Sequence, residues 1–397
     1  MSSVHLTICR HAVSWCTQAE EPLRLRDMLP LANLHSLQEL AVRSVSHTFL
    51  KPYMPAEVAG GLTALTSLVL EGCCVSCLAH LSSCVSLRVL EMGCADGLEE
   101  GLGAREWAAL RALTGLVDLG LQNARLLTAS EECCAAVSKL TRLQSFGAGV
   151  WSVGMLPALA HCTRLTQLVG RWQENLNSTA DEDGLLMSMH QLPSVVELGA
   201  TYGCPPFAAL PNLVAVEHSG SISAAAFASM PDHCPGLREL RVVGGDVDHT
   251  SPPRSEHRHV RIAAVKALSA LTGLLRLEFI VASSTELIAL VDVAGLSLSK
   301  GLQRLKVVVN RAGAMRTSAL MHLARLQGLP ELELHVSSAT AVEVTQDAKT
   351  LLSGLSGIRS VCLVGLGSNQ IDGVWAAQRE LQRSGLSCPK HLTVQGH

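Results

Sequence analysis

The sequence predicts an α/β solenoid, a curved right-handed superhelix of βα units with a parallel sheet on its inner side. Three observations predict this fold. A nine-residue phrase, LTGLVDLGL at residues 113–121, returns in close copies at residues 62–70, 271–279 and 326–334. Each copy closes with Leu-x-Leu or Leu-x-Phe, the two-residue period of a strand. The units also recur at a nearly constant spacing, which is typical of stacked repeats.

The chain is rich in aliphatic residues and poor in charge. Hydrophobic residues make up 48% and aromatic residues 3% of the sequence, and charged residues make up 16% against about 25% in an average domain. Many thin aliphatic layers are therefore expected rather than one deep core. The formal net charge of −3 argues against nucleic acid as a partner. The sequence contains no apolar run long enough for membrane insertion and no secretory signal, so we expect a cytoplasmic protein.

One strand is expected in each repeat unit, and we use the third leucine position of the unit as the mark of that strand. Residues 1–30 do not fit the phrase and are predicted to form an irregular N-terminal capping segment, with a short strand where Val4, Leu6 and Ile8 alternate with polar residues. Residues 31–397 are predicted to form one array of about 14 units, whose marks span 352 residues at a mean spacing of about 27. The marks are Leu40, Leu68, Leu90, Leu119, Phe146, Leu168, Leu198, Val216, Leu240, Leu277, Leu305, Leu332, Val361 and Leu392.

Helices are expected between the strands, on the outer side. Residues 261–273 and 318–328 read as helices that end near a glycine. Cys84, Cys162 and Cys234 stand where the phrase otherwise has leucine, so they are predicted to be small buried residues. With no secretory signal, we expect reduced thiols.

Three places interrupt the pattern. The step from Leu198 to Val216 is only 18 residues and would place His218 inside, so the register near residues 198–218 is open. The step from Leu240 to Leu277 is 37 residues and contains a polar segment, read as a loop insertion near residues 244–261 or as a joint between two sub-arrays. The sequence stops three residues after Val394. A preceding segment could cover this apolar end, the end could mediate end-to-end self-association, or the natural protein could be longer.

The phrase LxxLxxLxL at this spacing resembles the leucine-rich repeat family, most closely its ribonuclease-inhibitor-like and cysteine-containing long-repeat types. The resemblance covers about nine-tenths of the chain. The family pattern continues with Asn or Cys three residues after the second strand leucine, where Cys73 fits the pattern and Ala124 and Trp151 do not. The resemblance implies a concave face, formed by the residues that flank each strand leucine, that binds other proteins.

Charged residues flank the leucines in two groups. Glu71, Glu91 and Asp118 flank early strands, with Glu39, Arg43 and Gln122, and make that part mainly acidic. Later strands carry both signs. They hold Arg276, Arg304 and Lys306 together with Glu239, Arg241, Glu278, Glu331 and Glu333. This pattern is typical of ordinary solvent-facing charges, and it is also consistent with a two-signed docking groove that steers a partner.

Three aromatic residues follow their marks in successive units. Trp151, Trp172 and Tyr202 would lie near one another on one rim, either as interface anchors or as fillers of turns that lack the family's asparagine.

Metal and cofactor binding are not expected. Cys73, Cys74 and Cys77, and separately Cys133 with Cys134, lack the second pair that a zinc site needs. The polar loop holds Asp246, Asp248, His249, His257 and His259, which read as a solvated loop or, alternatively, as ligands of a divalent ion.

The sequence therefore predicts a non-catalytic scaffold that binds a protein partner on its concave face. We find no nucleophile elbow, phosphate-binding loop or zinc-protease helix. One alternative, by analogy with family members, is a GTPase regulator similar to RanGAP that uses Arg171, which lies beside a turn. Another is a structural component of the axoneme or cytoskeleton.

Overall fold

The strands and helices fall into two compact units. One comprises Met1–Thr201 with Ala208–Leu210, and the other comprises Tyr202–Phe207 with Pro211–His397. The protein is seen in a computed structural model. It describes residues 4–9, 12–17, 35–44, 56–71, 75–93, 102–125, 130–151, 153–172, 191–200, 207–218, 224–242, 270–281, 284–298, 301–309, 315 and 317–396.

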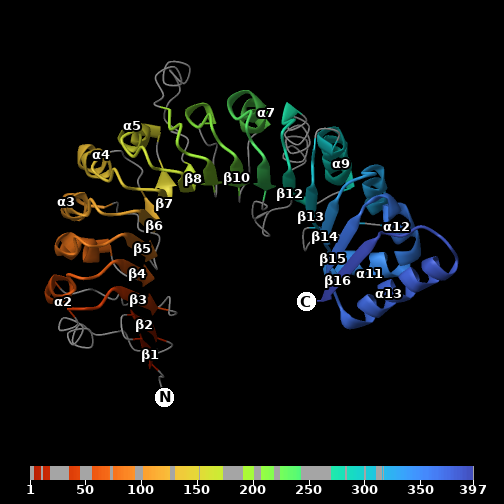
Figure 1. The fold of residues 1–397 in the computed structure, drawn as a ribbon, viewed down its shortest axis with the longest axis horizontal. Coiled ribbons are helices and arrows are strands. Elements are labelled where there is room, and N and C mark those ends of the chain that lie inside the picture. The colour runs from red at the N-terminus through yellow and green to blue at the C-terminus, as the bar shows by residue number, and fades with distance from the viewer. Residues whose placement is uncertain are drawn as a thin grey trace. The chain divides into compact units, whose positions relative to one another are not determined.

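The first unit is a stack of parallel strands begun by a hairpin (Figure 1). The predicted strand at residues 4–8 is present and pairs antiparallel with a second strand that the repeat pattern did not indicate. Every later strand of this unit is parallel to the one before it. The strands are β1 (Val4–Cys9), β2 (Ala12–Thr17), β3 (Glu39–Ser44), β4 (Ser67–Glu71), β5 (Val89–Gly93), β6 (Asp118–Arg125), β7 (Ser145–Trp151), β8 (Gln167–Trp172) and β9 (Glu197–Ala200).

Helices of both α and 3-10 type cover one face of this sheet. Only 22 residues separate Leu68 from Leu90, and their connection is a 3-10 helix rather than an α-helix. The step from Phe146 to Leu168 is equally long and contains both a 3-10 helix and a short α-helix. The helices are α2 (Ala56–Gly61), η2 (Val75–Ser83), α3 (Ala104–Ala112), α4 (Glu131–Val137), η3 (Val153–Met155), α5 (Leu156–Leu159) and η4 (Phe207–Ala209), the last shared by both units.

The second unit repeats the arrangement with longer helices. Its strands are all parallel: β10 (Ala215–His218), β11 (Glu239–Val242), β12 (Arg276–Val281), β13 (Arg304–Val309), β14 (Glu331–His335), β15 (Ser360–Leu366) and β16 (His391–Gly396). Its helices are α7 (Ala224–His233), α9 (Ser284–Leu298), α10 (Thr317–Leu320), η6 (Met321–Arg325), α11 (Ser338–Gln346), α12 (Ala348–Gly354), η7 (Leu355–Gly357) and α13 (Ser368–Arg383).

The predicted strand marks are confirmed, and with them the α/β solenoid. In each unit the marks are direct register partners from strand to strand, and all except Leu392 are buried. At the step that the sequence left open, Leu198 pairs with Leu168 and Val216 pairs with Leu240. His218 is accordingly buried. This continuous aliphatic row packs each strand onto the next and forms the core of each unit.

The three cysteines predicted to replace leucine are buried. The thiols of Cys84 and Cys162 donate hydrogen bonds to the carbonyls of Ala59 and Val137, one repeat earlier, over 3.4 and 3.5 Å. Burial raises the pKa of Cys162 to about 11 and that of Cys234 to about 12. The three thiols are therefore protonated packing groups, and those of Cys84 and Cys162 also satisfy a backbone carbonyl of the neighbouring layer.

The predicted helix at residues 318–328 is present as α10 followed by η6. It ends at Arg325, with Leu326 as its C-cap. In the turn that follows, Gly328 has a φ of +86°, in the left-handed region, and its N–H donates to the carbonyl of Gly357 over 2.9 Å. Three other predictions lie outside the described residues. They are most of the other predicted helix, the loop insertion near residues 244–261 and the proposed boundary at residue 30.

The last strand differs from those before it. Leu392 and Val394 are half-buried, whereas their register partners Val361 and Leu363 are fully buried. α13 packs against α12, where Lys349 and Glu380 form an ion pair of 2.5 Å. End-to-end association through this strand stays a prediction.

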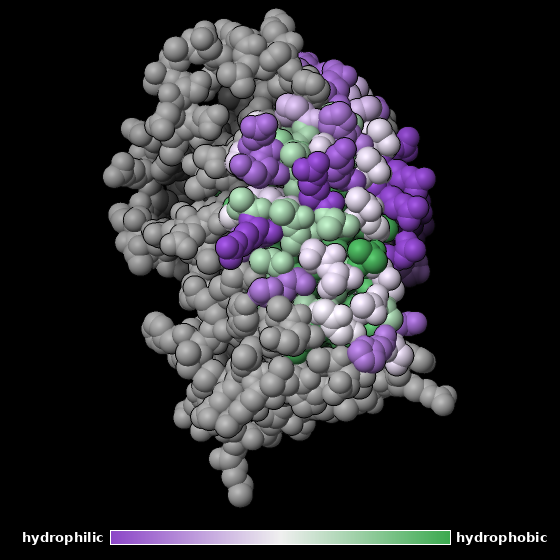
Figure 2. Space-filling model, turned by 90° about the vertical axis from the view of Figure 1, so that its left-hand side faces the viewer, coloured by the Kyte–Doolittle hydropathy of each residue, from purple (hydrophilic) through white to green (hydrophobic). Residues whose placement is uncertain are grey.

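The helix-bearing side of the first unit, which carries α2, η2, α3 and α4, mixes hydrophilic and hydrophobic residues (Figures 1 and 2). Within the part of the chain that the structure describes, no helix is both long and apolar enough to cross a membrane.

Candidate functional site

The candidate site is the open face of the sheet, which we define as the side of the strands opposite the helices. Because side chains alternate along a strand, the residues on either side of each buried mark lie on this face. Two rows of register partners form it in the first unit. The outer row is Glu39, Ser67, Val89, Asp118, Ser145, Gln167 and Glu197, and the central row is Ala41, Val69, Glu91, Gly120, Gly147, Val169 and Gly199.

Two corresponding rows lie on the strands of the second unit and have different chemistry. Its outer row is Ala215, Glu239, Arg276, Arg304, Glu331, Ser360 and His391, and its central row is Glu217, Arg241, Glu278, Lys306, Glu333, Cys362 and Thr393. Charged residues of opposite sign alternate along much of the central row. The candidate residues Arg276, Arg304 and Lys306 therefore lie together on one face, as predicted.

An unbroken chain of ion pairs follows the central row of the second unit. Arg241 reaches Glu217 on one neighbouring strand at 2.9 Å and Glu278 on the other at 3.0 Å. Lys306 continues the chain, at 3.1 Å from Glu278 and 3.6 Å from Glu333. Each cation thus bridges carboxylates of the strands on both sides, which ties five consecutive strands together.

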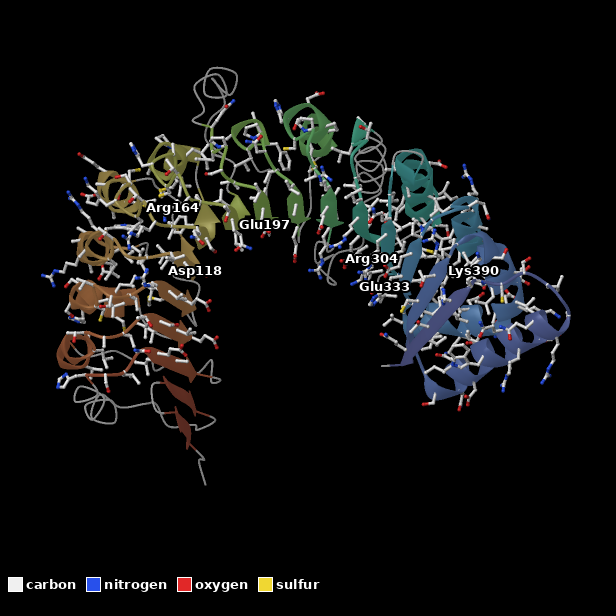
Figure 3. All side chains as sticks on the ribbon, viewed as in Figure 1. Asp118, Arg164, Glu197, Arg304, Glu333 and Lys390 are labelled. Carbon is white, nitrogen blue, oxygen red and sulfur yellow. The ribbon has the colours of Figure 1, made fainter. Side chains whose placement is uncertain are left out.

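Glu333 is the branch point of this chain (Figure 3). Its carboxylate accepts hydrogen bonds from Arg304 and from the ring of His335. Arg304 also pairs with Glu331 at 3.2 Å. Partial burial alone would raise the pKa of Glu333, but these hydrogen bonds and the charge of Lys306 outweigh it and lower the pKa to about 2. Glu333 is therefore ionised throughout the physiological range.

The neighbouring cations are stabilised in the same way. Burial alone would lower the pKa of Arg241, but Glu278 and Glu217 outweigh it and raise the pKa. The hydrogen bond that Arg304 donates to Glu333 raises the pKa of Arg304. A separate, more exposed pair joins Arg276 to Glu239 at 3.1 Å. The four cations of this face are thus each engaged by carboxylates of the same face.

The charged side chains that the structure describes on the open face of the first unit are acidic. Glu71 and Glu91 lie on β4 and β5, and Asp118 lies at the start of β6 (Figure 3). Among the side chains that the structure describes on β3 to β9, none carries a positive charge. Gln167 donates a hydrogen bond from Nε2 to Oε2 of Glu197 over 3.3 Å. Arg43 of β3 and Arg171 of β8 belong to the same strands, and their side chains lie outside the described residues. The contrast between an acidic early part and a mixed later part therefore stays a prediction.

The aromatic candidates are only partly described. Trp151 of β7 and Trp172 of β8 are register partners, so their backbones lie side by side. Arg171, the candidate for GTPase regulation, is the neighbouring residue of β8 and pairs with Val150. The side chains of all three and the whole of Tyr202 lie outside the described residues, so their roles stay predictions.

The metal candidates are likewise incomplete. Within the described residues no group of three or more His, Cys, Asp or Glu could hold a metal ion. Cys73, Cys74 and the loop with Asp246, Asp248, His249, His257 and His259 lie outside them. Cys133 is buried with its Sγ 3.2 Å from Sδ of Met155, and burial, with a smaller contribution from Cys134, raises its pKa to about 12. A protonated thiol is a poor metal ligand.

Two members of the ion-pair chain were not among the sequence candidates. Glu217 follows Val216 just as Arg241 follows Leu240, so the repeat register contained the signal. His335 lies two residues beyond Glu333 on the same side of β14, and that period-two relation would have indicated it.

Comparisons with known proteins give little beyond this geometry. No family model matches the chain, and no curated protein matches it. A solved structure described as the functional domain of InlJ from Listeria monocytogenes, including a cysteine ladder, is similar at 12% identity and a TM-score of 0.31. The similarity covers 82% of this chain and 64% of that one, so the chain spans less than two thirds of its length. The fold assignment therefore rests on the strand register described above.

Proposed function

We propose that the chain is a non-catalytic scaffold that binds a partner protein through the open face of its sheet. The observation that carries this proposal is the pair of side-chain rows, which repeat from strand to strand on a face that the helices leave uncovered. Parallel strands stack at about 4.8 Å, so each row presents a regularly spaced series of contacts. Such a surface suits an extended contact with another protein better than enclosure of a small molecule.

The size of this face supports a protein partner. The eight parallel strands described from β2 to β9 span about 34 Å at that spacing, and a five-residue strand adds a width of about 16 Å. The product, on the order of 550 Å², approaches the roughly 800 Å² per partner of a standard protein interface. The face is therefore large enough to form most of one side of such an interface.

The electrostatics of the face support a non-catalytic role. The carboxyl group with the largest pKa shift, that of Glu333, is held ionised with a pKa of about 2. A general acid or base at neutral pH needs a pKa near the working pH instead. The cations next to it bind carboxylates of the same face, so they stabilise the sheet in this state rather than a developing charge.

A site-specific photo-crosslinker tests the proposal. Placed at Ser145, in the outer row of the open face, it should form an adduct with a partner protein in an extract of the cells that make this chain. The matched control position is Arg164, an exposed residue in the turn after α5. Adducts from Ser145 and none from Arg164 are expected. Equal labelling from both positions, or labelling from Arg164 alone, would refute the assignment of the binding face.

A further inference from the structure

The last strand of the second unit, β16, is an edge strand of the sheet (Figure 1). Leu392 and Val394 on its helix side are half-buried, whereas their register partners on β15, Val361 and Leu363, are fully buried. A further strand beside β16 would bury this pair in the same way, because the buried marks of β11 to β15 each have a strand on both sides. We propose that a second copy of this chain supplies that strand, through antiparallel pairing of β16 with β16 about a twofold axis.

The backbone of β16 directs hydrogen-bonding groups to the outer edge of the sheet. The N–H of His391 donates to the carbonyl of Arg359, at the start of β15, over 3.1 Å. In a parallel ladder, successive residues of a strand direct their N–H and C=O groups alternately to the two sides. The groups of Leu392 and Val394 therefore point away from β15. An open row of this kind is a template for pairing with another strand.

The edge lacks the features that usually prevent strands from pairing between molecules. Exposed edges are commonly protected by lysine, by proline, by inward-pointing charges or by a bulge in the edge strand. The sequence of β16, HLTVQG, contains no Lys, Arg, Asp, Glu or Pro. All six of its residues pair with β15, and the one irregularity of this pairing lies on β15, between Val364 and Leu366. The outer edge of β16 is therefore regular and open to a partner strand.

The side chains of β16 complement their own copy in one antiparallel register. Residues that point outward must pair with one another, so the twofold axis passes beside a residue and not between two. Centred on Thr393, the pairing places Leu392 opposite Val394 on the helix side, and His391 opposite Gln395 on the open face. Centred on Val394 it would place Leu392 opposite a glycine, and centred on Leu392 it would place Val394 opposite a lysine. Only the register centred on Thr393 joins the two apolar residues, and no ionisable group of the strand then faces its own copy.

The size of this edge predicts a weak dimer. A strand of six residues is about 20 Å long, and its edge covers less than the roughly 800 Å² per partner of a standard interface, so a dissociation constant on the order of micromolar is expected. Paired residues point to the same side of a sheet, so the open faces of the two second units would lie on one side of a joined sheet. The pairing does not cover the open face, and the inference therefore goes beyond the proposed function without depending on it.

Charges at Thr393 test the pairing, because this exposed residue would face its own copy. Thr393→Lys and Thr393→Glu each place like charges directly opposite one another, which destabilises a strand pair. In sedimentation equilibrium at low salt, we expect the mass of the unmodified protein to rise from 42.1 kDa toward twice that value between about 1 and about 100 μM, the range of a weak interface. Each variant alone should dimerise at least fivefold more weakly. An equimolar mixture of the two should return to within twofold of the unmodified protein, because opposite charges then meet.

His391→Lys is the matched control, because it adds a positive charge to the same face of β16 but would face Gln395 of the second copy. We expect it to weaken dimerisation less than twofold. A protein that stays monomeric to about 100 μM, equal weakening by Thr393→Lys and His391→Lys, or a mixture that does not recover would each overturn the inference. A mass that rises beyond the dimer without limit would show head-to-tail association and overturn the twofold arrangement. Crosslinking from Ser145 reports on the first unit, so the proposed function stands or fails separately.

Discussion

Replacing Glu333 with glutamine removes the branch point of the ion-pair chain in the second unit. Its side chain is only 13% exposed and contacts Arg304 and Lys306 in addition to His335. In Glu333→Gln, Lys306 would keep Glu278 and Arg304 would keep Glu331 as their carboxylate partners. Two half-buried cations would each lose one of two counter-charges, and the fold around them would become less stable.

The size of the effect follows from the pKa of the carboxyl group. A fall from 4.5 to about 2 is equivalent to roughly 3 kcal/mol at about 1.4 kcal/mol per pKa unit, and solvent screening of a partly exposed site reduces it. We expect Glu333→Gln to lower the free energy of unfolding by about 1–2 kcal/mol at pH 7. Because the pKa is lower in the folded state, this stabilisation is complete above about pH 5 and is lost as the pH falls through 2.

Urea denaturation followed by circular dichroism measures this difference, since urea, unlike guanidinium chloride, does not screen charges. Hydrogen exchange of the amides of β13 and β14 shows whether the loss is local. Glu239→Gln is the control, because its pair with Arg276 is 46% and 61% exposed and should contribute below about 0.5 kcal/mol. The reasoning is refuted if both variants lose the same stability, or if the deficit of Glu333→Gln is as large at pH 3 as at pH 7.

Three further predictions concern single positions elsewhere in the chain. Gly328→Ala should cost about 1 kcal/mol in a thermal melt, because φ is +86° although the space around its Cβ position is empty; Gly60→Ala, in a helix and equally unobstructed, should instead stabilise by about 0.5–1 kcal/mol. Cys234, with a pKa of about 12, should react with iodoacetamide only after unfolding, as mass spectrometry of its peptide would show; fast labelling of the native protein contradicts its burial. Phe146→Ala should lower the free energy of unfolding by about 3–5 kcal/mol in a urea titration, because Phe146 is fully buried in the strand row; a loss below 1 kcal/mol would mean that this row does not form the core.

The repeat phrase predicts the strands well, because the leucine row is the only arrangement that buries its period-two pattern. Leu198 and Val216 show the strength of this signal, since each keeps its register beside a step of only 18 residues. The second strand of the N-terminal hairpin, Ala12–Thr17, was missed because it lies outside the repeat and is defined by its pairing with β1. The helical connections were harder for a related reason. Steps of the same length, 22 residues, contain η2 in one case and η3 with α5 in another, so the spacing does not determine the type of helix.

The candidate face was predicted in its position but not in its connections. Alternation along each strand places Arg304, Lys306 and Glu333 on the same side, and this is readable from the sequence. The pairing of cations with carboxylates depends on the register between strands and on how far each side chain reaches. The sequence of a single repeat specifies neither the register nor the reach. Glu333 illustrates the difference, since its low pKa arises from groups on two strands.

Within the units, successive marks are separated by as few as 22 and as many as 37 residues, yet they remain direct neighbours. The register of the strands therefore does not depend on the length of the chain that connects one strand to the next. Insertions and deletions can accumulate on the side of the helices while the residues of the open face keep their spacing and register. During evolution, single substitutions on this face could therefore change what the protein recognises while the positions of the strands stay the same.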